Sequence, residues 1–92
     1  MPALLCERVG PGMRDSERTV EIKDIQDRRE YLRVPLGFLE VVGDTYYVPV
    51  GLVYEDPVQR VALIELSQEG EYGNWRLWVH MADLLPPKGN SE

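Results

Sequence analysis

Apolar and polar residues alternate with period two in several short segments of this chain, and turn-forming residues separate the segments. The clearest alternation spans residues 75–81, where one face consists of Trp75, Leu77, Val79 and Met81. The opposite face consists of Arg76, Trp78 and His80. Because this alternation is typical of a half-buried strand, we expect the first face in the core, anchored by Trp75, and the second face away from it.

Four further segments show a similar pattern and predict short strands at residues 3–9, 17–25, 29–34 and 60–66. A polar turn joins 17–25 to 29–34, which indicates a hairpin whose inward residues are Val20, Ile22, Leu32 and Val34. Residues 35–42 fit either a helical turn or the start of a strand. Gly43 and Asp44 then form a two-residue turn signal of the kind that closes hairpins.

The longest apolar run spans residues 45–54, and its expected inward set is Tyr46, Val48, Val50 and Leu52. Pro49 cannot donate a hydrogen bond to a neighbouring strand, and Gly51 favours a bend. We therefore expect this strand to lie at a sheet edge or to be bulged near these two residues.

Five to six short strands without a long amphipathic helix predict an all-β, mostly antiparallel fold, and specifically a small β-barrel. With 92 residues there is room for one domain, which we place at residues 1–85. Residues 82–85 leave space for one short helical turn before Pro86 and Pro87. Residues 86–92 are expected to form a disordered C-terminal tail.

Residues 50–84 resemble the PRC-barrel family. The shared pattern is a Gly-containing strand at 50–54, an Asp-Pro turn at Asp56 and Pro57, an apolar strand at 60–66, and a closing strand that ends in Asp83-Leu84. The resemblance implies a non-catalytic module that docks on a larger assembly, as in photosynthetic reaction centres and a ribosome-maturation factor. Residues 17–34 have no counterpart in the pattern, so another small barrel, similar to SH3 domains, is the alternative.

The charge balance narrows the classes of partner. Sixteen acidic residues against ten basic ones give a net charge of −6 and a pI near 4.7. This balance disfavours binding to a phosphate backbone and to an anionic membrane surface. A single cysteine excludes an internal disulfide, and no apolar run approaches the length of a membrane helix. We therefore expect a cytoplasmic protein that does not insert into membranes.

No arrangement of residues indicates catalysis, a metal site or a cofactor. His80 is the only histidine, and Cys6 is expected to be a small apolar residue buried on the first strand. The carboxylates, among them Glu21, Asp24 and Glu30, are expected on loops and outward strand positions without forming an acid–base pair. The chain is accordingly predicted not to be an enzyme.

The aromatic residues are the best candidates for function. Trp78 is expected on an outer face between Arg76 and His80, and Tyr47 and Tyr54 could approach it from a neighbouring strand. Trp, Tyr and Arg dominate binding hot spots. An alternative places Trp78 over a minor cluster beneath the 67–73 loop or the N-terminal segment.

The sequence thus predicts a protein-interaction or assembly module that binds a protein partner or a second copy of itself. A nucleic-acid- or ribosome-associated accessory factor is the alternative function. A small-molecule binder or an enzyme of unrecognised type is the third.

Overall fold

The computed structural model describes residues 2–85, and strands make up most of its regular structure. Strand residues make up 56% and helical residues 7% of the structure, and every strand pairing is antiparallel. The strands are β1 (Ala3–Leu5), β2 (Arg8–Pro11), β3 (Glu17–Lys23), β4 (Arg29–Pro35), β5 (Glu40–Val42), β6 (Thr45–Pro49), β7 (Gly51–Asp56), β8 (Val61–Glu65), β9 (Arg76–His80) and β10 (Leu84–Leu85). Two 3-10 turns, η1 (Leu36–Phe38) and η2 (Met81–Asp83), complete the regular structure.

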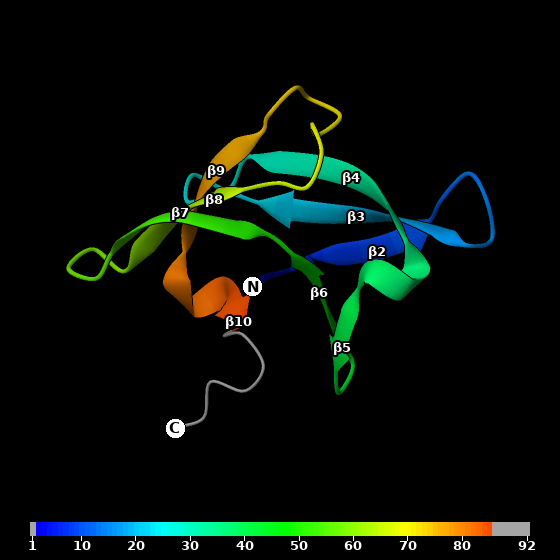
Figure 1. Ribbon diagram of the computed structural model, residues 1–92, viewed down its shortest axis with the longest axis horizontal. Coiled ribbons are helices and arrows are strands. Elements are labelled where there is room, and N and C mark those ends of the chain that lie inside the picture. The colour runs from blue at the N-terminus through cyan, green and yellow to red at the C-terminus, as the bar shows by residue number, and fades with distance from the viewer. Residues whose placement is uncertain (1, 86–92) are drawn as a thin grey trace.

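These strands form three sheets (Figure 1). The first has the order β10-β1-β6-β5, the second β2-β3-β4 and the third β7-β8-β9. The second sheet contains the expected hairpin, in which Val20 lies opposite Leu32 and Glu21 opposite Tyr31. Gly43, at φ +62°, forms the turn between β5 and β6, as expected of a glycine at this position.

The chain passes from one sheet to the next at two bends. Residues 6 and 7 separate β1 from β2, where the Cys6 amide still donates to the Tyr46 carbonyl and the Glu7 amide already donates to the Glu21 carbonyl. Val50 separates β6 from β7, and its amide donates to the Pro2 carbonyl. The sheets are therefore joined by continuous backbone.

One hydrophobic cluster lies between the three sheets. Its members from the second sheet are Val20, Ile22, Leu32 and Val34, and those from the third are Ala62, Ile64, Leu77 and Val79. Leu4, Cys6, Val48, Val50 and Leu66 complete it. The inward faces predicted for the hairpin and for Leu77 and Val79 are thus confirmed.

The all-β, antiparallel prediction is confirmed, but the count of five to six strands is wrong. The predicted strand at 3–9 is split into β1 and β2, and the run at 45–54 is split into β6 and β7. A closed barrel is not found among residues 2–85, where the strands form three sheets. The expected helical turn is present as η2, but it begins one residue earlier than predicted, and residues 84–85 form β10 instead. The two alternatives for residues 35–42 both occur, as η1 followed by β5.

Two residues expected in the core are exposed. Trp75 is 52% exposed, because β9 begins at Arg76 and the period-two alternation does not extend to the residue before it. Leu52 is exposed because β7 is an edge strand with a bulge between Leu52 and Tyr54. The tail predicted at residues 86–92 lies outside the described residues. Within residues 2–85 there is no helix of the length and apolarity needed to cross a membrane.

Candidate functional site

The register of β7, β8 and β9 places aromatic residues in one row across the outer face of the third sheet. Trp78 on β9 lies opposite Leu63 on β8, and Leu63 lies opposite Tyr54 on β7. The rings of Tyr54 and Trp78 meet edge to face above Leu63, with centroids 6.1 Å apart and planes at 80°. This geometry is one of the preferred arrangements of aromatic pairs.

Both rings remain accessible to solvent, Tyr54 at 57% and Trp78 at 39%. On one side of the aromatic pair, Arg76 on β9 lies opposite Glu65 on β8, and their side chains approach to 3.8 Å. On the other side of the aromatic pair, His80 on β9 lies opposite Val61 on β8. Arg76, Trp78, His80 and Tyr54 therefore share one surface, called here the outer face, as the alternation of residues 75–81 predicted.

Tyr47, the fifth residue expected at this surface, belongs to another sheet. It lies on β6 opposite Leu5 on β1 and Glu40 on β5. The bend at Val50 separates it from Tyr54 because β6 and β7 enter different sheets. The structure therefore does not bring Tyr47 into the outer face.

A groove of about 450 Å³ is lined by Trp78 and lies beside the edge of β9 that faces away from β8. One wall is the turn between β3 and β4, which is joined to β9 by the Ile25 amide donating to the Trp78 carbonyl at 2.9 Å. The groove is lined by Asp24, Ile25, Gln26, Arg28, Arg29, Tyr72, Asn74, Arg76, Leu77 and Trp78. It thus brings the guanidinium groups of Arg28 and Arg76 close to the exposed rings of Tyr72 and Trp78.

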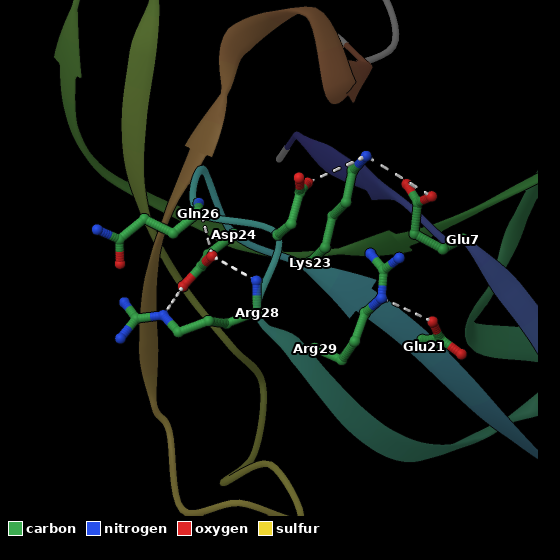
Figure 2. A network of polar contacts seen from close by, with 8 residues as sticks. Glu7, Glu21, Lys23, Asp24, Gln26, Arg28 and Arg29 are labelled. Carbon is green, nitrogen blue, oxygen red and sulfur yellow. Dashed lines mark hydrogen bonds and ion pairs between the residues drawn. The ribbon is translucent and has the colours of Figure 1, made fainter.

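Asp24 holds the β3–β4 turn in place (Figure 2). Its Oδ1 accepts hydrogen bonds from the amides of Gln26 at 2.8 Å and Arg28 at 3.0 Å, and its Oδ2 accepts from Arg28 Nε at 2.9 Å. Burial alone would raise the pKa of Asp24, but these hydrogen bonds and the Arg28 charge outweigh it and lower the pKa. The expectation that Asp24 is a solvated carboxylate is therefore wrong.

Arg28, Arg29 and Arg76 each have one carboxylate neighbour. Besides the contact of Arg28 with Asp24, Arg29 Nε lies 3.1 Å from Glu21 Oε2 and Arg76 Nη2 lies 3.8 Å from Glu65 Oε1. Glu21 occupies an outward strand position as expected, between the inward Val20 and Ile22, but its side chain is only 16% exposed and lies against Arg29 rather than in open solvent. In Figure 2 the side chains of Gln26 and Arg28 extend to the β9 side of the turn, whereas those of Lys23 and Arg29 extend to the other side.

Glu30 supports the opposite wall of the groove. Its side chain is buried, with the residue only 1% exposed, and Oε1 accepts from the amides of Tyr31 and Tyr72 at 2.8 and 2.9 Å. Oε2 accepts from the amide and side chain of Asn74 at 3.2 and 2.8 Å. Burial alone would raise the pKa of Glu30, but these donors lower it.

The expectation that Glu30 is solvated is wrong, and the sequence held a signal for its burial. Alternation in residues 29–34 places Glu30 on the same face as Leu32 and Val34. Gly70 suits the position beside it, because a Cβ there would collide with the Glu30 side chain. Glu30 therefore ties the 70–74 loop to β4.

Cys6 and His80 do not form a nucleophile–base pair. Cys6 is buried in the core, and burial together with the Glu7 charge raises the pKa of its thiol to about 12. His80 lies exposed on the outer face. Residues 2–85 contain no cluster of three or more potential metal ligands.

Comparison of the chain with protein-family models, with curated proteins and with solved structures finds no match. The resemblance of residues 50–84 to PRC-barrels stays a prediction. The function is accordingly inferred from the chain's own residues.

Proposed function

We propose that this protein is a non-catalytic interaction module that docks a protein partner, or a second copy of itself, on the outer face of β7, β8 and β9. The observation that carries the proposal is the exposed Tyr54–Trp78 pair, which lies above Leu63 and is flanked by Arg76 and His80. Aromatic residues and arginine at the centre of a surface typically dominate binding energy.

The surroundings of the pair support a protein as the partner. Val53, at the bulge of β7 next to Tyr54, is also exposed and extends the apolar surface toward the edge of the sheet. The outer edge of β7 is not paired with another described strand, so its backbone groups are free for a partner. The bulge at Leu52–Tyr54 shortens the regular part of this edge, which favours docking by side chains over strand addition.

The finer points of the fold and the location belong to the same proposal. We infer that the three joined sheets form an open variant of a small barrel similar to PRC-barrel or SH3 domains. The resemblance of residues 50–84 and the short strands around one core support this. We place the protein in the cytoplasm, where a single reduced cysteine is ordinary.

The test compares Tyr54→Ala and Trp78→Ala with Trp75→Ala, which removes the same type of side chain three positions from Trp78 but outside the outer face. Self-association is measured by sedimentation equilibrium, and partners are measured by quantitative affinity capture with the full chain. We expect Tyr54→Ala and Trp78→Ala to weaken binding by about tenfold or more, and Trp75→Ala to leave it unchanged.

Circular dichroism checks that each variant is folded. Losing the aromatic pair is expected to cost about 1–2 kcal/mol, less than the 5–15 kcal/mol that small domains typically possess. The proposal would be contradicted if Tyr54→Ala and Trp78→Ala both captured partners as the wild type does and showed the same molecular mass in sedimentation equilibrium. Loss of binding in Trp75→Ala alone would move the binding surface to the 70–75 loop.

A further inference from the structure

We propose that the groove between the β3–β4 turn and β9 binds a short acidic peptide segment, with a carboxylate on Arg28 and an apolar side chain against Trp78. The inference rests on the proposed function, because Trp78 belongs both to the outer face and to the groove. It adds the chemical class of the partner.

The shape of the groove suits an extended peptide segment. Its volume of about 450 Å³ lies within the range of clefts that hold ligands. The turn at residues 24–28 and Arg29 form one wall, β9 forms the floor through Leu77 and Trp78, and Tyr72 and Asn74 form the far wall. Both walls are fixed by buried carboxylates, Asp24 in the turn and Glu30 behind the 70–74 loop.

Charge complementarity favours an acidic occupant. Three arginines line the groove, but Arg29 extends to the other side of the turn toward Glu21 and Arg76 lies 3.8 Å from Glu65, so the positive charge offered to a ligand is that of Arg28. Arg28 has the clearest free donors: its side chain is 74% exposed, and its hydrogen bond to Asp24 uses Nε only. Within residues 2–85, Nη1 and Nη2 of Arg28 have no hydrogen-bond partner, and a guanidinium edge with two free nitrogens matches a carboxylate.

The position of Arg28 is set before any ligand arrives. Asp24 accepts from both the amide and the Nε of Arg28, so backbone and side chain are held by the same carboxylate. In Figure 2 the Arg28 side chain extends across β9 beside that of Gln26. Less rotational freedom is then lost on binding, which is the usual benefit of preorganisation.

An apolar contact is available next to this charge. Trp78 and Ile25 are both exposed and both line the groove, and Leu77 lies beneath them. The Ile25–Trp78 backbone hydrogen bond keeps these two residues adjacent. The expected ligand therefore carries an aromatic or aliphatic residue close to its carboxylate.

A peptide fits better than a nucleic acid. Each groove arginine has a carboxylate within 4 Å, namely Asp24, Glu21 or Glu65. These charges oppose a continuous polyanion, which needs many unpaired cations along its path. A single carboxylate needs only the free edge of one guanidinium group, which Arg28 supplies.

The test begins with a random-peptide phage library selected on the full-length protein. A synthetic version of the most enriched peptide is then compared with a version in which every Asp and Glu is replaced by Asn or Gln. We expect enriched peptides to combine an acidic residue with a neighbouring apolar one, and the amide version to bind about tenfold more weakly or worse. Failure to enrich any peptide, or equal binding of both versions, would overturn the proposal.

Variants locate the binding. Arg28→Ala should weaken the acidic peptide about tenfold, and Arg28→Lys should recover only part of the affinity because lysine lacks the planar edge. Arg14→Ala is the matched control: Arg14 precedes β3, whereas the turn follows it, so seven strand residues or about 20 Å separate the two sites. An unchanged affinity in Arg28→Ala would place the peptide elsewhere and overturn the assignment.

Two further comparisons distinguish failure of this inference from failure of the proposed function. Tyr54 lies on the outer face and does not line the groove. Loss of partner capture in Tyr54→Ala with unchanged peptide binding in Arg28→Ala would support the outer face and reject the groove. Unchanged partner capture in Tyr54→Ala together with weakened peptide binding in Arg28→Ala would support the groove and reject the outer face. Salt-sensitive binding of an oligo-dT strand that exceeds peptide binding would reject the acidic peptide in favour of single-stranded nucleic acid.

Discussion

Glu30→Gln, which replaces a buried carboxylate by an amide, should destabilise the protein more than the same change at an exposed carboxylate. Glu30 accepts four hydrogen bonds, two at each oxygen. In Glu30→Gln one oxygen becomes an NH₂ group that cannot accept, so two donors lose their partner and face another donor. Hydrogen bonds to charged groups contribute about 1.5–3 kcal/mol each and are not additive. We expect a loss of about 3 kcal/mol.

The effect should be easy to measure. For a domain of this size, 1 kcal/mol corresponds to a shift in melting temperature of about 4–8 °C, so Glu30→Gln should melt roughly 12–24 °C lower. Urea unfolding followed by tryptophan fluorescence should show a lower midpoint with an unchanged slope. Glu71→Gln is the control in the same loop. Its carboxylate is half-exposed and only 3.7 Å from Arg33, so the loss should stay below about 1 kcal/mol.

The pH dependence follows from the direction of the pKa shift. Because hydrogen bonding lowers the pKa of Glu30 in the folded state, its contribution is fully present above the pKa of the unfolded chain. The contribution is lost as the pH falls through the lower folded-state value. The gap in stability between wild type and Glu30→Gln should therefore close in acid. A cost below about 0.5 kcal/mol at neutral pH, or a gap that does not depend on pH, would refute the reasoning.

Three other predictions concern burial. Trp75→Ala should cost about 1 kcal/mol or less because the ring is half-exposed, whereas Leu77→Ala should cost about 2–5 kcal/mol, both measured by urea unfolding. The Cys6 thiol, buried and with its pKa raised to about 12, should react with a thiol reagent at pH 8 only after denaturation; rapid reaction of the folded protein would show that it is accessible. Gly70→Ala should destabilise by about 1–3 kcal/mol because its Cβ collides with Glu30, and a neutral substitution would show that this loop shifts freely.

The parts of the fold that alternation controls could be predicted from the sequence. Val20 and Ile22 face the core, Leu77 and Val79 do likewise, and Trp78 faces outward, because side-chain direction has period two once a strand exists. The alternation does not specify where a strand begins. The pattern therefore predicts a strand that starts at Trp75, one residue before β9 begins.

The remaining errors come from contacts between distant residues. Splitting of the 45–54 run depends on the Val50 amide reaching the Pro2 carbonyl, and burial of Glu30 depends on donors 42 and 44 residues away. The Val50–Pro2 contact leaves no local pattern, and the alternation of residues 29–34 places Glu30 on the core face without indicating the distant donors that satisfy it. The same holds for the groove, which exists because the β3–β4 turn lies beside β9 through the Ile25–Trp78 hydrogen bond.

The position of β1 has a consequence for how the chain acquires its structure during synthesis. β1 lies between β6 and β10, so Ala3 is paired with both Pro49 and Leu85. Synthesis must therefore reach Leu85 before β1 gains both of its neighbours. Until then the apolar Leu4 lacks its full cover, and chaperone contact with the nascent chain should concentrate on this segment.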